Sequence, residues 1–237
     1  SREHLSRDCV PFVYLEEETG TIGDKVSRTR YAYDAYGNVE AVSLDGDITS
    51  VDDDSQVWRT YYANTSPGNY IVDRLAMEVV LNDQVGSWES IMTNTSLIEK
   101  ETWYIYDGYS EPESDSVNKG DLTEVRAFTS GFGGTGNWIS AASYTYDDWG
   151  NTDSETDGNG NTWNTTYDDD HLFPMSISSP LNQSETYSFD PGTGNLLSRI
   201  DVNDQTTYYE YDVFGRTTKV IRVGDTNESP SVEYQYN

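Results

Sequence analysis

The chain has 237 residues, of which 35% are hydrophobic and 13% aromatic, and its formal net charge at pH 7 is −28. Nucleic acids and anionic membrane surfaces repel so negative a protein, so we expect neither as a partner. The single cysteine, Cys9, excludes an internal disulfide and any metal centre built from cysteines. No run approaches the ~18 apolar residues of a membrane-spanning helix.

Rings with polar tips carry much of the apolar area, since the chain has 19 tyrosines and 6 tryptophans. Both residue types favour β-strands, where the ring can be buried while its polar tip stays in water. The 19 glycines, together with many Asn, Asp, Ser and Thr residues, are typical of turns. The composition therefore predicts an all-β protein with many short strands.

The first copy of a repeated motif, Tyr-x-Tyr-Asp-x-x-Gly-Asn, begins at Tyr31. Tyr31 and Tyr33 alternate, so both rings lie on one face of a strand. Asp34 begins a turn in which its carboxylate accepts a hydrogen bond from a backbone N–H two residues later. Gly37 stands where a hairpin loop needs a positive φ. The motif predicts an antiparallel hairpin whose return strand covers residues 38–44.

The motif is diverged between about residues 47 and 129, where we expect strands separated by turns and loops. No segment there combines a helical apolar period with capping residues, so we expect no helix. The expected elements are strands over 58–64 and 71–80, a turn over 66–69, a truncated motif over 104–108, and exposed loops over 111–120 and 131–136.

Four further copies follow at nearly equal spacing, with the second aromatic residue at Tyr146, Tyr167, Phe189 and Tyr211, which are steps of 21, 22 and 22 residues. Two additional turns, at 157–161 and 201–205, divide the repeats into three strands each. Because isolated hairpins are marginally stable, we expect the repeats to pair edge to edge into one long strip. The repeat residues of these copies are Tyr144, Tyr146, Asp147 and Gly150; Tyr167 and Asp168; Phe189, Asp190 and Gly194; and Tyr209, Tyr211, Asp212 and Gly215.

The last residues, 232–237, match the opening strand of another repeat, with Asn237 at the aspartate position. We therefore expect the natural array to continue beyond this chain. The chain as a whole is interpreted as a fragment of a single repeat array. Residues 1–139 form its diverged part, with loops, and residues 140–237 its regular part.

The motif, spaced by about 20 residues, resembles the YD repeat of bacterial RHS proteins, of the B and C components of insecticidal toxin complexes, and of teneurins. The likeness is clear over about residues 28–46 and 140–237 and moderate between them. It implies an antiparallel β-strip, curved or spiral, in a secreted or cell-surface bacterial protein. In that family the strip forms a shell that encloses or presents a toxin-like C-terminal polypeptide, so the implied partners are the rest of a longer chain and such a polypeptide.

One stretch, 189–198, resembles the sequence that precedes the cleavage motif in self-cleaving members of that family. Here Asn195 stands where an arginine is expected, and another repeat follows in place of a cleavage motif. We interpret Asp190 as a turn residue rather than a protease residue.

Catalytic patterns are missing from the sequence. The two histidines, His4 and His171, are not near a Gly-x-Ser-x-Gly elbow, and the glycine loop at 131–136 lacks the Gly-Lys-Ser/Thr of a phosphate-binding loop. The sequence does not decide whether two carboxylates form a pair of the glycosidase kind, because only their separation in space defines such a pair. We expect no catalytic residue, no enzyme activity and no cofactor.

Calcium is an alternative to plain turns at two acidic segments, 153–158 and 52–54. The first resembles the start of an oxygen-ligand loop, but its twelfth position is Asn164 in place of the bidentate glutamate. We favour turns at both.

Two functions remain, a structural shell segment and, as the alternative, a surface adhesion module that binds glycans or a partner protein. Adhesion would need exposed rings, whereas strand-period rings more often pack within the sheet. The six tryptophans are Trp58, Trp88, Trp103, Trp138, Trp149 and Trp163. We favour packing for all of them except Trp149, which lies in a turn.

Overall fold

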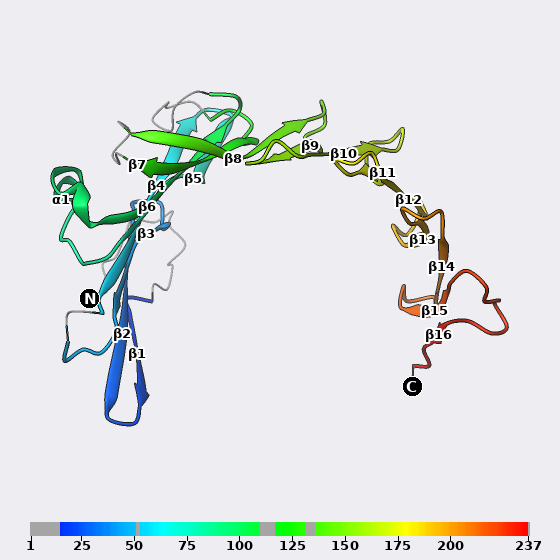
Figure 1. Ribbon diagram of the computed structural model, residues 1–237, viewed down its shortest axis with the longest axis horizontal. Helices are drawn as coiled ribbons and strands as arrows, with labels where there is room; N and C mark the ends of the chain where they lie inside the picture. Colours follow the sequence, from blue (N-terminus) through cyan, green and yellow to red (C-terminus); the bar gives the residue numbers. More distant parts are fainter. Residues whose placement is uncertain (1–14, 51–52, 110–116, 131–135, 237) are drawn as a thin grey trace. The chain divides into compact units, whose positions relative to one another are not determined.

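The computed structural model describes residues 15–50, 53–109, 117–130 and 136–236 (Figure 1). Its contacts divide the chain into an N-terminal unit, Ser1–Ala141, and a C-terminal unit, Ala142–Asn237. The described residues form sixteen strands, each hydrogen-bonded to the next along the chain, so the strand order in the sheet is the sequence order. Neighbouring strands run antiparallel wherever their register is defined, as in the hairpin of β2 and β3. The predicted all-β antiparallel strip is confirmed.

The N-terminal unit contains the long strands and all the buried side chains among the described residues. Three apolar clusters form its core, centred on Tyr62 and Tyr106, on Val79 and Leu81, and on Trp103. Its strands are β1 (Glu17–Ile22), β2 (Lys25–Tyr33), β3 (Val39–Asp45), β4 (Ser55–Ser66), β5 (Asn69–Leu81), β6 (Ile98–Tyr106), β7 (Leu122–Ser130) and the first half of β8 (Asn137–Tyr146).

The expectation that no helix occurs is wrong, because β5 and β6 are joined by α1 (Trp88–Thr93) and the 3₁₀ turn η1 (Thr95–Leu97). The Ser87 hydroxyl caps α1 by accepting a hydrogen bond from the Ser90 N–H at 3.3 Å. Ile91 of the helix is fully buried in the core. Six residues make fewer than two turns, too few to display a helical apolar period.

The C-terminal unit is one layer of short strands without a buried side chain among its described residues. Its turns match the predicted ones at 157–161 and 201–205, which separate β9 from β10 and β13 from β14. Its strands, after the second half of β8, are β9 (Thr152–Asp157), β10 (Thr162–Tyr167), β11 (Pro174–Ser178), β12 (Ser184–Phe189), β13 (Leu196–Ile200), β14 (Thr206–Tyr211), β15 (Thr217–Ile221) and β16 (Val232–Glu233).

The strand register of the C-terminal unit separates its side chains into two chemically different faces, because directly paired residues share a face. The aromatic face carries rings and aliphatic groups, including those of Tyr144, Trp163, Ile177, Tyr187 and Tyr209, and the charged residues paired with them, Glu155, Glu185 and Arg199. The hydroxyl face carries serines and threonines, including Thr156, Thr162, Ser176, Ser184, Thr186, Ser188 and Ser198. Because both faces stay accessible, the unit depends on strand hydrogen bonds, turns and cross-strand contacts for its stability.

A register shift precedes the second aromatic residue of the repeats throughout the chain. It occurs in the diverged region too, at Tyr61 and Tyr106, where further shifts lie at Tyr62/Asn64 and Val80/Leu81. The shifts lie at Ala32/Tyr33, Thr60/Tyr61, Ile105/Tyr106, Thr145/Tyr146, Thr166/Tyr167, Ser188/Phe189 and Glu210/Tyr211.

Candidate functional site: the Tyr-Asp turns

Each Tyr-Asp turn is held by its aspartate, as the turn between β8 and β9 illustrates. The Asp147 N–H donates to the Asn151 carbonyl at 2.9 Å, and the Gly150 N–H donates to the Asp147 carbonyl at 3.2 Å. One carboxylate oxygen of Asp147 accepts the backbone N–H groups of Trp149 and Asn151, at 3.0 and 2.8 Å. The other accepts the Asn151 side-chain amide at 3.0 Å. We call this arrangement the carboxylate clamp.

The same clamp recurs at three other turns of matching length, while Asp201 accepts the two backbone N–H groups without the side-chain bond. Asp34, Asp157 and Asp212 each accept the N–H groups two and four residues later, and the side chain of the latter residue binds the second carboxylate oxygen. The predicted role of Asp34 is therefore confirmed. The longer turns at Asp168 and Asp190 also use the carboxylate as an acceptor, but for other N–H groups. Asp168 accepts those four and five residues later, and Asp190 those two and three residues later.

The hydrogen bonds of the clamp favour the ionised carboxylate. At Asp157 they lower the pKa, chiefly through the Asn161 amide. At Asp190 the Thr193 hydroxyl and N–H lower the pKa. Burial at Asp147 raises the pKa, but the hydrogen bonds from Asn151 and Trp149 outweigh it and the pKa is lowered. Ionised acceptors of this kind cannot supply a proton as general acids near neutral pH.

The clamped turns need a left-handed residue in fourth place. The predicted left-handed conformation of Gly37, Gly150 and Gly215 is confirmed by φ values of +92°, +88° and +77°. Gly194, in fifth place of the longer turn at Asp190, also has a positive φ, of +73°. These turns are hairpin loops built on a type I turn followed by a left-handed residue.

Gly215→Val should destabilise the C-terminal unit by about 1–2 kcal/mol, because a β-branched residue is strained at a positive φ. Gly158→Val is the matched control, since Gly158 lies in a clamped turn but outside the left-handed region. It should change the unfolding free energy by less than about 0.5 kcal/mol. Urea unfolding measures both, and equal losses would show that the turn geometry is not the cause.

The truncated motif at Asp107 is closed by the same clamp across a long insertion. The Asp107 N–H donates to the Asp121 carbonyl at 2.8 Å, and Gly120 has a φ of +82°. The Asp107 carboxylate accepts the backbone N–H groups of residues 118–121 at 2.7–3.1 Å. Gly120-Asp121 thus takes the place of Gly-Asn, separated from Asp107 by residues 108–119.

The expectation of an exposed loop over 111–120 is wrong at Val117, whereas Asn118 and Lys119 are exposed as expected. The Val117 side chain is fully buried in the cluster of Tyr62 and Tyr106, and its carbonyl accepts the Asn64 amide at 2.8 Å. Residues 111–116, like most of the predicted loop at 131–136, lie outside the described residues. The sequence signal for the closure was Gly120-Asp121-Leu122, which mimics the Gly-Asn-Val of the first copy.

The second tyrosine of the motif joins its repeat to the preceding one. The hydroxyl of Tyr211 donates to the Leu196 carbonyl at 2.8 Å, and that of Tyr167 to the Thr152 carbonyl at 3.1 Å. Each acceptor directly follows the Gly-Asn or Gly-Arg pair of the turn before. We call this bond the tyrosine staple; further staples run from Tyr61 to Val39 at 3.0 Å and from Tyr236 to Thr217 at 2.8 Å.

Phe189, which has no hydroxyl, keeps the junction by a different contact. Its ring stacks on Phe173 with centroids 5.1 Å apart. Phe173 occupies the place that asparagine or arginine holds in the other turns, so a pair of rings replaces a pair of polar groups. The repeat pattern predicts that the tyrosines pack, but it carries no signal for the staple.

Tyr211→Phe should lower the unfolding free energy of the C-terminal unit by about 1 kcal/mol, the usual net contribution of one hydrogen bond. Tyr208→Phe removes the same atom from an exposed ring on the hydroxyl face and should change stability by much less. Thermal unfolding of the two variants side by side measures the difference. Equal midpoints would contradict the staple.

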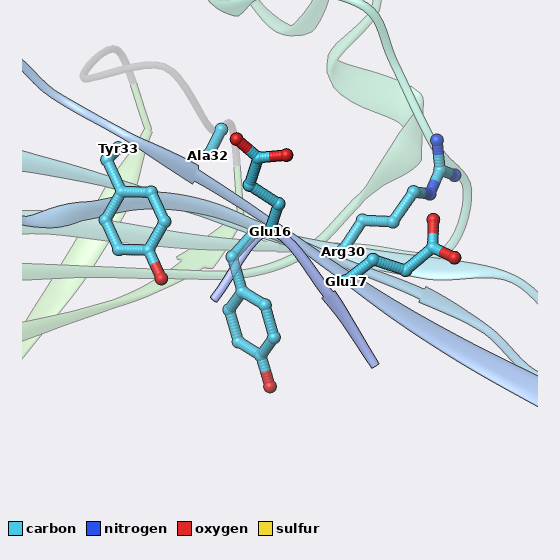
Figure 2. Close-up of a pocket in the computed structure, with 6 residues that line it drawn as sticks. Glu16, Glu17, Arg30, Ala32 and Tyr33 are labelled. Carbon is cyan, nitrogen blue, oxygen red and sulfur yellow. The ribbon is translucent and has the colours of Figure 1, made fainter. Parts of the chain in front are cut away.

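The first repeat borders an open pocket of about 500 Å³ (Figure 2). Here the Tyr33 hydroxyl donates to the Leu15 carbonyl at 2.9 Å, so residue 15 takes the place of a preceding repeat. The side chains of Glu16 and Glu17 extend in different directions in Figure 2. The pocket lining consists of Glu16, Glu17, Arg30, Tyr31, Ala32 and Tyr33.

The first calcium candidate, 153–158, contains a carboxylate that the fold already uses, since Asp157 forms the clamp. Within residues 15–50, 53–109, 117–130 and 136–236, no three His, Cys, Asp or Glu side chains gather as a metal site. The second candidate, 52–54, begins outside that part of the chain. In the same part, no helix is long and apolar enough to span a membrane.

Packing is confirmed for three tryptophans, because Trp58, Trp88 and Trp103 all contact the core clusters. The remaining three lie at the surface. Trp138 lies beneath the Arg126 guanidinium, 4.3 Å from the ring centroid, and Trp163 is on the aromatic face. Trp149, in its turn, is 64% exposed.

Comparisons with known proteins give a match in structure only. No protein-family model matches the sequence, and no curated protein matches it. The crystal structure of TcdB2-TccC3 is similar, with a TM-score of 0.60 and 7% identity, and that of TcdB2-TccC3-Cdc42 has a TM-score of 0.61 and 9% identity. Each match covers 90% of this chain and 14% of the other. The chain thus has the fold of these toxin-complex proteins, which the resemblance to YD repeats predicted.

Proposed function

We propose that this chain is a non-catalytic wall segment of a large RHS-type protein, secreted or displayed at the cell surface. In the proposal, its strip forms part of a shell that encloses or presents a toxin-like polypeptide. Since the chain spans 14% of the length of the similar chains, most of such a shell would come from other segments of the same protein.

One observation carries the proposal, the combination of a clamp inside a repeat with a staple to the repeat before. Asp212 closes its own turn, while Tyr211 of the same motif binds the preceding return strand at Leu196. Repeats joined in this way extend a sheet in one direction and in a constant register, as a continuous wall requires. The clamp carboxylates serve as hydrogen-bond acceptors, which supports a structural role.

The adhesion alternative is weaker because the exposed tryptophans of the C-terminal unit do not share one surface, and the tyrosines of the aromatic face are half-buried. Trp163 lies on the aromatic face, Tyr208 on the hydroxyl face, and Trp149 in a turn. Glycan binding by stacking needs several rings that face the same ligand. A glycan array on the isolated chain should therefore give no specific signal, whereas binding abolished by Trp149→Ala would favour adhesion.

Limited proteolysis of the full-length protein tests the shell. The segment that follows the repeat array should resist protease in the native protein and be degraded when it is produced alone. Equal degradation in both forms would refute enclosure, even if the repeats keep the described fold.

A further inference from the structure

The last residue of each Tyr-Asp turn reaches forward to the next repeat. We call it the closing residue, because its carbonyl accepts the N–H of the turn's aspartate at 2.8–3.0 Å. Side chains of three chemical kinds, an amide, an aromatic ring and a guanidinium group, occupy this one structural position. The closing residues of the Tyr-Asp turns in the C-terminal unit are Asn151, Phe173, Asn195 and Arg216.

The two closing asparagines lie against the left-handed residue of the following turn. The Asn151 amide donates to the carbonyl of His171, whose φ is +57°, at 2.9 Å. The amide oxygen of Asn195 lies 3.8 Å from the position that a Cβ on Gly215 would take. Both asparagines are followed by a repeat whose second aromatic residue is a tyrosine that forms a staple.

The closing phenylalanine faces a repeat of a different kind. The Phe173 ring stacks on Phe189, the second aromatic residue of the following repeat, with an angle of 15° between the rings. It also lies 3.5 Å from the position that a Cβ on Gly194 would take in the following turn. The closing arginine returns to the first kind, because the Arg216 guanidinium lies 4.3 Å from the ring centroid of Tyr236, which forms a staple.

The forward contact belongs to the Tyr-Asp turns and not to every clamped turn. Asn161 closes the turn between β9 and β10, and its amide donates to Asp157 at 2.9 Å, as the amide of Asn151 donates to Asp147 at 3.0 Å. Asn161 lies at the opposite edge of the strip, where it is exposed. Asn151 uses its second amide hydrogen for His171 of the next repeat.

We propose that the closing residue is a specificity-determining residue of the array, which selects the kind of repeat that can follow. A closing asparagine fits a repeat whose second aromatic residue is a stapled tyrosine, and a closing phenylalanine fits a repeat in which that residue is phenylalanine. Since the repeats otherwise share one motif, such matching opposes pairing out of order, a characteristic failure of repeat proteins. The inference does not depend on the proposed shell, because it concerns the order of repeats within the strip.

A double-mutant cycle at the junction of Asn195 and Tyr211 tests the matching. Asn195→Phe and Tyr211→Phe each create a mismatch and should each raise the unfolding equilibrium constant about fivefold. The double variant reproduces the ring pair of Phe173 and Phe189, so its constant should lie within about twofold of the parent's. Independent effects would instead multiply to about 25-fold.

Asn161→Phe is the matched control, because it places the same ring at a closing residue of the opposite edge. Its effect should multiply with that of Tyr211→Phe. Urea unfolding of the chain, followed by circular dichroism, measures all five variants.

Independent effects in the Asn195 cycle, or equal coupling of Tyr211→Phe to Asn161→Phe, would overturn the proposal. If Asn195→Phe alone does not fold, a folded double variant demonstrates the matching, and an unfolded one refutes it. Each outcome is obtained on this chain alone and is therefore independent of whether the full-length protein encloses a polypeptide.

Discussion

Asp107→Ala should cause the largest loss of stability of any single change in a Tyr-Asp turn, about 3–4 kcal/mol in the N-terminal unit. The substitution leaves the backbone N–H groups of residues 118–121 without their acceptor. It also releases the segment that carries Val117, whose side chain is fully buried beside Tyr62. Urea unfolding of the N-terminal unit, followed by tryptophan fluorescence, measures the loss.

Two further variants make the result specific. Asp107→Asn keeps one oxygen acceptor and tolerates the φ of +55°, so it should cost about half as much. Asp73→Ala removes an exposed carboxylate that pairs with Arg74 alone, and it should cost less than about 0.5 kcal/mol. Similar losses for Asp73→Ala and Asp107→Ala would show that the clamp does not hold the insertion.

The second large effect is acid destabilisation of the N-terminal unit through Asp45. This carboxylate is buried, and it accepts hydrogen bonds from Arg28, Arg30 and Gln84 at 2.5, 2.9 and 2.6 Å. Burial raises its pKa, but these three partners outweigh burial and lower the pKa to about 2. A depressed pKa means that the folded state favours the ionised form.

The sign of the pH effect follows from that shift. The stabilisation is fully present above the ordinary aspartate pKa of about 4 and is lost as the pH falls toward 2. Its size is about 2 kcal/mol, since one pKa unit corresponds to about 1.4 kcal/mol. The unfolding free energy measured from pH 5 to pH 2 should decrease by that amount through Asp45. In Asp45→Asn, which is less stable at pH 5, this part of the decrease should be missing; an identical pH profile would contradict the assignment.

The features that sequence analysis predicted are those whose chemistry is local. Asp147, Gly150 and Asn151 lie within five residues, and their types dictate a clamped turn wherever they occur. The spacing of such turns then defined the strands between them. For this reason the Tyr-Asp turns of the C-terminal unit, the turns at 157–161 and 201–205, and the pairing order were predicted. The turn at 179–183, which has a serine in place of the aspartate, was not.

The features that sequence analysis did not reveal depend on contacts between distant residues. The staple of Tyr211 ends on a carbonyl fifteen residues earlier, and a carbonyl carries no residue-type signal. The clamp of Asp107 closes across an insertion, which hides the spacing that identifies the motif. Gln84 reaches Asp45 over 39 residues, and neither belongs to the repeat pattern.

Cryo-electron microscopy of the full-length protein tests the proposed shell most directly. The account predicts that this chain appears as consecutive hairpins in a single-layered wall, with tyrosine staples between repeats and the following polypeptide inside. A map in which the strands pair out of sequence order, or in which the chain forms no part of a wall around another segment, would contradict it.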